Sequence, residues 1–285
     1  MSTLDPNPIE IACDKSLEDF ERDYMPPRSS YAHYTAPSKS SDGTSKSYKL
    51  GLYTPKTLPP KDLTACLNLI EKTSGKHYRE SRDGWSVRRK RSEMMLWDLR
   101  YLVVREGSSC HGTGEGEWED AEEAGDGEGG DDGEREHRGE EEEETIVEEF
   151  EEEEEGEIKG FMSFMPTFED GIMVLYLYEI HLVDEVRGTG LGTHLMSIVT
   201  SVAQAIPGVK KTMLTCYTAN EAGLKFYRKL GYETDEFSPE PKRLKGGRVV
   251  ENDYVILSKC VDRKDEGEGE GEERRIGDGK RKRSE

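Results

Sequence analysis

A glycine-rich turn and a carboxylate that precedes it are the residues of this sequence best suited to chemistry. The turn Arg187-Gly-Thr-Gly-Leu-Gly192 follows an apolar stretch that predicts a strand and precedes a stretch that predicts a helix. At such a junction successive backbone N–H groups and the positive end of the helix face one point, which makes an anion site. Glu179 lies near the end of the same apolar stretch, where a carboxylate can take a proton from an amine.

Both features have plainer interpretations. An ordinary tight turn, or the GxGxxG turn of a dinucleotide-binding fold, would look similar to the glycine turn. Here the spacing is Arg-x-x-Gly-x-Gly, the turn follows a late strand, and no acidic residue ends a strand about twenty positions on, as a dinucleotide fold requires. Glu179 could be a charge on a solvated strand face, although its neighbours are apolar.

The elements that must position these residues follow an α/β pattern. Strands are predicted over 100–104, 158–165, 173–183, 211–217 and 249–258. Helices are predicted from 191 to near Pro207 and over 220–230, after two earlier helical stretches, one capped by Asp62 and one over 89–97. The order β-β-β-α-β-α-β predicts one mixed α/β domain over about 59–260.

An acidic block, Glu106 to Glu157, separates the first two predicted strands. It holds 26 acidic and 2 basic residues, a net charge of −24, while the whole chain carries −21, so the remainder is mildly basic. This composition cannot bury enough apolar surface to offset the entropy of ordering, and it predicts a disordered insertion in the turn of a hairpin. The block is either a solvated spacer or a device that steers basic partners electrostatically.

The two ends of the chain show little of the hydrophobic periodicity that is typical of helices and strands. Residues 1–58 predict a flexible N-terminal arm or a segment draped over the domain, and 261–285 a charged, disordered C-terminal tail. Lys280-Arg-Lys-Arg283 is a short basic cluster of the nuclear-import type, although such clusters are often merely solvated.

Cysteine usage and hydropathy exclude several classes. The five cysteines are scattered and form no CxxC pair, which argues against a disulfide framework and a zinc site, so no metal is expected. Charges and prolines stand where a signal peptide needs an apolar run, and no stretch approaches the length of a membrane span. We therefore expect an intracellular, soluble protein without a membrane partner.

The glycine turn and a second motif resemble the GNAT superfamily of N-acetyltransferases. Arg187 to Gly192 resembles its pyrophosphate-binding signature, and Asn220…Phe226-Tyr227…Leu230-Gly-Tyr232 resembles its second cofactor helix, in the same order and spacing. The resemblance implies a GNAT-type mixed sheet flanked by helices, with acetyl-CoA as co-substrate.

A narrower resemblance is to the superfamily members that acetylate the N-terminal serine of histone H4 and histone 2A. The segments that carry it are Gly84-Trp85, Lys90-Arg91-Ser-Glu-Met94, Tyr176-Leu-Tyr-Glu-Ile-His-Leu182, Met213-Leu-Thr215 and Asp253-Tyr-Val-Ile-Leu-Ser258. It implies direct attack of a Ser-Gly-Arg-Gly terminus on the thioester, without a covalent enzyme intermediate. It also implies location in nucleus and cytoplasm and no direct nucleic-acid partner, and leaves open action at the ribosome, the preferred histone and the oligomeric state.

The same resemblance assigns the site residues. Glu179 is the general base, and Tyr227 protonates the departing CoA thiolate, unless Tyr227 is a core aromatic. The residues expected to hold the cofactor are Ile180, His181, Leu182, Arg187, Gly188, Thr189, Gly190, Leu191, Gly192, Thr193 and Asn220. Those expected to bind the peptide are Trp85, Thr167, Glu169, Tyr178, Thr215, Ser238 and Tyr254.

Two of these positions depart from the family. Thr167 stands where the family usually has an aspartate that contacts the substrate, and the loss of a charge-assisted hydrogen bond there weakens recognition of a third-residue arginine. Ser238 lies one place off a family serine, and Phe237 occupies the aligned position.

Two other functions stay open. The first is a GNAT enzyme that acts on a lysine or a small amine, against which the Gly84-Trp85 and Tyr178-Glu179 pairs speak. The second is an acidic histone-binding protein with a vestigial acetyltransferase domain. The intact glycine turn, with Glu179 and Asn220, argues against such decay.

Replacing Glu106 to Glu157 with a short Gly/Ser turn should leave the melting temperature and the turnover number nearly unchanged, because the block has no core. If the block steers basic tails, kcat/KM for a long histone H4 tail should fall at low salt, while a Ser-Gly-Arg-Gly peptide barely changes. The difference should shrink as the Debye length falls from about 30 Å at 0.01 M to about 8 Å at 0.15 M. Equal kcat/KM for the long tail would favour the spacer, and loss of folding would contradict the domain boundaries.

Overall fold

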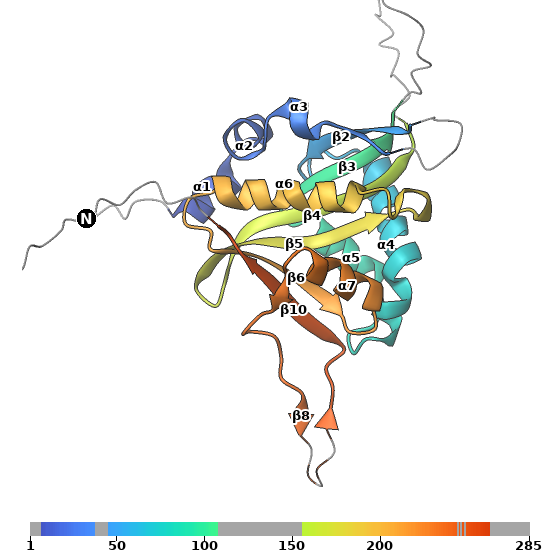
Figure 1. The fold of residues 1–285 in the computed structure, drawn as a ribbon, viewed down its shortest axis with the longest axis vertical. Helices are drawn as coiled ribbons and strands as arrows, with labels where there is room; N and C mark the ends of the chain where they lie inside the picture. The colour runs from blue at the N-terminus through green and yellow to red at the C-terminus, as the bar shows by residue number, and fades with distance from the viewer. Residues whose placement is uncertain are drawn as a thin grey trace, which may run out of the picture.

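The computed structural model describes residues 7–37, 45–107 and 156–262, apart from 244, 246 and 248. Within these residues, one eight-stranded sheet has the order β1-β2-β3-β4-β5-β6-β10-β7 (Figure 1). Its strands are β1 (His33–Thr35), β2 (Ser47–Tyr53), β3 (Arg100–Glu106), β4 (Ile158–Glu169), β5 (Ile172–Leu182), β6 (Lys211–Tyr217), β7 (Glu233–Thr234) and β10 (Tyr254–Cys260). The short strands β8 (Lys242–Arg243) and β9 (Val249–Val250) pair separately.

Helices cover both faces of the sheet. They are α1 (Pro8–Asp14), α2 (Leu17–Tyr24), α3 (Arg28–Tyr31), α4 (Pro60–Glu80), α5 (Val87–Met94), α6 (Leu191–Ala205) and α7 (Glu221–Lys229), with a 3-10 turn η1 (Asp184–Val186) before α6. The predicted mixed α/β fold is confirmed. Among the described residues, no helix combines the length and the apolar character needed to cross a membrane.

The two faces of the sheet carry separate apolar cores, because side chains alternate along each strand. Leu102 and Val104 of β3 belong to the core beneath α1, α2 and α6. Tyr101 and Val103 belong to the core beneath α4 and α5. All four side chains are completely buried, so β3 is covered by an apolar core on both faces of the sheet.

The segment before residue 59 is part of the domain. Helices α1 and α2 begin at side-chain caps, Asn7 and Ser16, and pack on the α6 face of the sheet, while β2 pairs with β3 from Tyr48 to Tyr53. Phe20 of α2 is completely buried. The buried guanidinium of Arg100 donates to the carbonyl oxygens of Cys13 and Lys15 and lies 4.8 Å from the Phe20 ring. The flexible-arm prediction is therefore wrong for the described residues of this segment.

Strands β3 and β4 form the predicted hairpin, paired antiparallel from Arg100–Phe164 to Arg105–Ile158. The acidic insertion connects the two strands in the turn of this hairpin. Its residues 108–155 lie outside the described residues. At its two ends, the carboxylates of Glu106 and Glu157 both pair with Lys159. The C-terminal basic cluster, Lys280 to Arg283, also lies outside them.

Two expected boundaries differ. Asp62 is not the cap of α4, which begins at Pro60; instead its buried carboxylate accepts a hydrogen bond from Arg105 at 2.6 Å and ties α4 to β3. The last strand of the sheet begins at Tyr254 rather than at Val249, because Val249 and Val250 pair with β8 in a separate hairpin. Both errors arise where a tertiary contact decides the local structure.

Phe20→Ala tests whether the N-terminal segment belongs to the core. Because the ring is completely buried, we expect a loss of about 3–5 kcal/mol in the free energy of unfolding, measured in urea. Ile11→Ala on α1 is the control, since Ile11 is 39% exposed and should change stability far less. Equal, small effects of the two substitutions would contradict the packing described here.

Candidate active site

The sheet splits between β5 and β6. These two parallel strands pair only from Val174 to Leu177 on β5, opposite Lys211 to Leu214 on β6. A bulge follows at Tyr178, because Ser163 of β4 faces Glu179 while Phe164 faces Leu177. Beyond it β5 pairs with β4 alone and β6 with β10 alone, so one backbone edge of β5 has no strand beside it.

A cavity of about 380 Å³ lies at this split. Its walls come from α4, α5, β4, β5, β6 and α7. The lining residues are Ser74, Tyr78, Lys90, Glu93, Glu169, Tyr176, Tyr178, Glu179, Ile180, His181, Thr215, Cys216, Tyr217, Asn220 and Tyr227. Eight of the residues assigned from sequence are among them, so both assigned catalytic side chains meet at one place.

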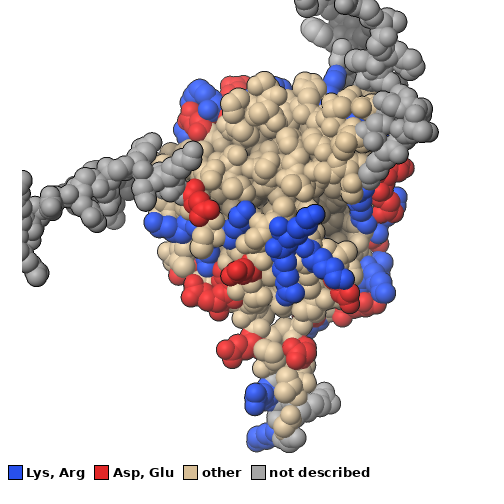
Figure 2. Space-filling model, viewed as in Figure 1, with Lys and Arg blue, Asp and Glu red and all other residues tan. Residues whose placement is uncertain are grey.

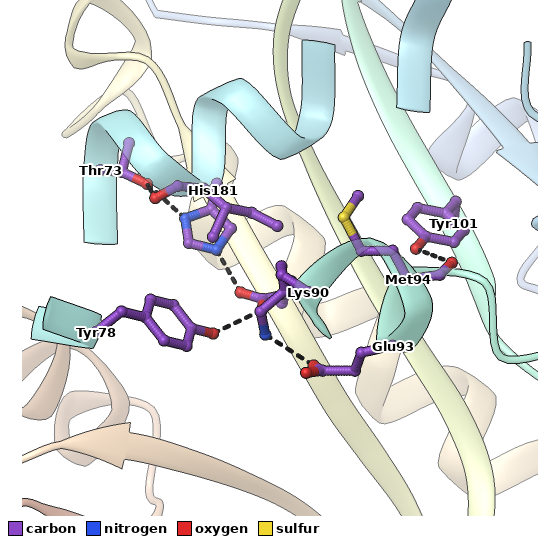
Figure 3. A network of polar contacts seen from close by, with 9 residues as sticks. Thr73, Tyr78, Lys90, Glu93, Met94, Tyr101 and His181 are labelled. Atoms are coloured by element: carbon purple, nitrogen blue, oxygen red, sulfur yellow. Dashed lines mark hydrogen bonds and ion pairs between the residues drawn. The ribbon is translucent and has the colours of Figure 1, made fainter. Parts of the chain in front are cut away.

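Glu179 is the centre of a buried polar network in this cavity. One carboxylate oxygen accepts from Tyr78 Oη at 3.0 Å and from Lys90 Nζ at 2.8 Å, and the other lies 2.5 Å from His181 Nε2. Lys90 Nζ also donates to Glu93 at 2.8 Å. Figure 3 shows the partners converging from α4, α5 and β5, and the Glu179 side chain is only 8% exposed.

Both ring nitrogens of His181 have polar partners. The Thr73 hydroxyl lies 2.7 Å from the Leu69 carbonyl oxygen and 2.6 Å from His181 Nδ1. An ionised carboxylate can only accept, so the Nε2 that faces Glu179 carries a proton. Because both ring nitrogens are engaged by Thr73 and Glu179, only the backbone groups of His181 can serve the cofactor role assigned to this residue.

The network sets the charge of Glu179. Burial alone would raise the pKa of its carboxyl, but the charges and hydrogen bonds of His181 and Lys90 lower that pKa to about 2. Burial lowers the pKa of Lys90, and Glu179 and Glu93 raise it by more, so the net shift is upward. Glu179 is thus a carboxylate and Lys90 an ammonium throughout the neutral range.

The glycine turn joins the end of β5 to α6 through two residues with positive φ. Gly188 has φ 69° and Gly190 has φ 96°, a region that only glycine enters without strain. The buried Thr189 between them donates its hydroxyl to the Val186 carbonyl at 2.7 Å. Gly190 is the N-cap of α6 and offers no side chain, and the first turn of the helix carries no acidic residue.

This turn fits an anion. The N–H groups of Gly192 and Thr193, in the first turn of α6, have no intrahelical acceptor and carry the positive end of the helix dipole. Arg187 turns its side chain back, where it donates to the Leu182 carbonyl at 3.0 Å and pairs with Asp184 at 2.9 Å. The turn therefore offers an anion its backbone donors.

Positive side chains lie beside the turn. Gly192 packs close to the Phe226 ring of α7. Figure 2 shows Lys and Arg side chains gathered over α7, whose exposed basic residues are Lys225, Arg228 and Lys229. Such a patch attracts an anionic ligand to this face.

Among the described residues, no group of three or more His, Cys, Asp or Glu side chains is placed to hold a metal ion.

The two assigned residues of α7 both reach the cavity. Asn220 caps the helix, its side-chain oxygen accepting from the Gly223 N–H at 3.0 Å, and it also lines the cavity. Tyr227 is 9% exposed, and burial raises the pKa of its hydroxyl, so it stays protonated and able to donate.

The peptide-binding assignments divide into two groups. Glu169, Tyr178 and Thr215 line the cavity, and Thr215 Oγ1 lies 2.6 Å from Tyr176 Oη. Trp85 does not line the cavity itself but packs on Tyr78, which does, with the ring centroids 5.2 Å apart.

The other three assigned residues do not line the cavity. Ser238 accepts from the Ile256 N–H at 3.0 Å, a bond within the fold. Thr167 stands opposite Val174 near the β4–β5 turn, and Tyr254 stands opposite Tyr217 at the start of β10. Their substrate roles stay predictions.

Lys90, Tyr78 and Glu93 are site residues to which sequence reasoning gave no role. Lys90 and Glu93 stand three residues apart, a spacing that puts both on one face of a helix. That spacing is the only local signal. Nothing in the sequence indicates that this face meets Glu179, 89 residues further along the chain.

Gly190→Glu should abolish binding of acetyl-CoA, the expected co-substrate. A side chain at φ 96° is strained, its Cβ would lie 2.6 Å from the Tyr34 hydroxyl, and its charge would oppose the helix end. Calorimetry on the folded variant measures this, with Gly171→Ala, in the β4–β5 turn, as a control for strain alone. Unchanged affinity in Gly190→Glu would remove the turn from the cofactor site.

One family model and several solved structures are similar to this chain. Residues 110–232 match the model of the "Acetyltransferase (GNAT) family". The chain is similar to the Arabidopsis thaliana NAA60 structure with a bisubstrate analogue, at 10% identity and a TM-score of 0.42, over 75% of this chain and 99% of that one. It is similar to spermidine N-acetyltransferase from Vibrio cholerae, with CoA and spermine, at 12% identity and a TM-score of 0.41, over 74% and 95%.

Likenesses this distant do not decide the substrate of this chain. The family match supports acetyl-CoA as co-substrate. Its matched residues contain β4, β5, the glycine turn, α6, β6 and α7. Residues 110–232 thus match an acetyltransferase model over the strands, turn and helices that form the site.

Proposed function

We propose that the protein is an N-alpha-acetyltransferase of the NatD type, which transfers acetyl from acetyl-CoA to the N-terminal serine of histone H4 and histone 2A. The observation that carries the proposal is the position of Glu179, buried and ionised in a cavity at the β5–β6 split. The substrate assignment rests on the narrower sequence resemblance. Action in nucleus and cytoplasm belongs to the same proposal, and action at the ribosome stays open.

Cofactor binding uses the end of β5 and the turn after it. The N–H groups of the turn hold the pyrophosphate, and the unpaired backbone edge of β5 beyond Tyr178 offers hydrogen bonds to an extended chain. Acetyl-CoA, when bound, supplies the thioester carbonyl that the amine attacks. The backbone and side chains of this domain bind it, exclude water and orient the amine.

Glu179 acts on the attacking amine. An α-ammonium has a pKa near 8, so a carboxyl with a pKa of about 2 does not deprotonate it in the ground state. Glu179 instead accepts a hydrogen bond from the neutral amine and takes its proton as the C–N bond forms, when the nitrogen has become strongly acidic. Tyr227 donates a proton to the sulfur as the C–S bond breaks.

Acidic side chains at the cavity fit a basic N-terminal tail. Glu93 and Glu169 line the cavity together with Glu179, and Lys90 is a cation already balanced by Glu93 and Glu179. Burial, followed by the neighbouring Asp170, raises the pKa of Glu169. A cation that pairs with Glu169 would reverse that shift, as expected for a tail with an arginine at its third position.

Transfer of labelled acetyl from acetyl-CoA to synthetic N-terminal peptides of histone H4 and histone 2A tests the function. The control is the same histone H4 peptide with a blocked N-terminus and its lysines intact. We expect label on the free α-amine alone. Equal labelling of the blocked peptide would favour a lysine acetyltransferase, and no transfer to either, with histone binding retained, would favour the vestigial domain.

Glu179→Gln should lower kcat by roughly 10²- to 10⁴-fold and change peptide affinity far less. In the unsubstituted protein Glu179 stays ionised well below neutral pH, so kcat/KM should rise with pH towards the pKa of the peptide amine, near 8. The exposed Glu80→Gln on α4 is the control. Near-normal turnover in Glu179→Gln would refute this role. So would a pH profile in which kcat/KM does not rise towards the pKa of the peptide amine.

A further inference from the structure

The N-terminal segment touches the glycine turn through Tyr34 of β1. Its hydroxyl donates to the Thr189 carbonyl at 2.8 Å. Its ring lies against the imidazole of His194 on α6, with the ring centroids 5.0 Å apart. The same hydroxyl occupies the space beside Gly190, where an added Cβ would lie 2.6 Å from it. One side chain thus supports the turn on its carbonyl side.

The contact fixes the direction of a neighbouring donor. In a trans peptide the C=O and the N–H of one plane point in opposite directions, and the described residues contain no cis peptide. With the Thr189 carbonyl held on Tyr34, the Gly190 N–H points away from Tyr34. No group in the described ranges accepts from that N–H. Glycine would otherwise allow this peptide plane to rotate, because it populates both signs of φ.

We propose that Tyr34 is a positioning residue for the cofactor turn. Its hydroxyl holds the Thr189–Gly190 peptide so that the Gly190 N–H faces the pyrophosphate of acetyl-CoA. This inference rests on the proposed function, which supplies the anion. It makes the N-terminal segment a part of the cofactor site as well as of the core.

Tyr34→Phe in the full-length chain tests this role, with Tyr31→Phe as the matched control. Tyr31 is 2% exposed and lies in the same segment, but its hydroxyl bonds to Glu21 within that segment. By calorimetry we expect Tyr34→Phe to weaken acetyl-CoA binding about 2- to 12-fold, the effect of one hydrogen bond. Tyr31→Phe should bind acetyl-CoA as the unsubstituted chain does, whatever its loss in melting temperature.

A second substrate separates positioning from general stability. S-acetylpantetheine carries the thioester without the pyrophosphate, so Tyr34→Phe should raise KM for acetyl-CoA and leave kcat/KM for S-acetylpantetheine unchanged. An unchanged Kd for acetyl-CoA in Tyr34→Phe, or equal losses with both thioesters, would overturn the role of Tyr34 alone. Absence of acetyl-CoA binding in the unsubstituted chain would overturn the proposed function and this inference together.

Discussion

Strands β5 and β6 stay paired for only four residues, and the site depends on that limit. From Tyr178 onward the bulge against β4 and the end of the pairing between β5 and β6 leave a gap in the sheet without breaking it, while β6 stays paired with β10. The gap frees the backbone edge of β5 and opens the cavity beside it. It also brings the glycine turn, which follows β5, and α7, which follows β6, to the same end of the sheet.

Burial of Glu179 in this gap requires compensation. An isolated carboxylate this deep would be protonated, since removing a charge from water costs several kcal/mol. The Lys90 ammonium, a ring N–H of His181 and the Tyr78 hydroxyl keep it ionised, and Thr73 and Glu93 in turn hold His181 and Lys90. Helices α4 and α5 therefore do more than cover one face of the sheet. They determine the charge of the residue that faces the amine.

Local patterns predicted the half of the domain from β3 to α7 well. The apolar strands, the glycine turn and the Asn220 cap all lie in segments whose hydrophobic period or turn chemistry identifies them. The composition of the N-terminal segment left a flexible arm or a draped segment open, whereas the structure packs it on the sheet. Asn7-Pro8, and Ser16 with Asp19 three residues later, are local start signals for α1 and α2.

The network around Glu179 could not be predicted in the same way. Lys90 reaches it from another helix, and the pairing depends on how α5 packs over the β5–β6 split. A hydrophobic period or a sequence motif describes one helix or strand at a time, whereas this ion pair depends on how two of them pack together. For the same reason Tyr34, 155 residues before Thr189, carries no sequence signal of its contact.

Hydrogen exchange with and without acetyl-CoA tests most directly whether the split in the sheet is the cofactor site. Binding there should slow exchange of the backbone amides of β5 beyond Tyr178 and of the turn from Gly188 to Thr193. Amides of α1 at the far end of the domain should exchange as before. Slowed exchange at a different surface, with the end of β5 and the glycine turn unchanged, would contradict the account.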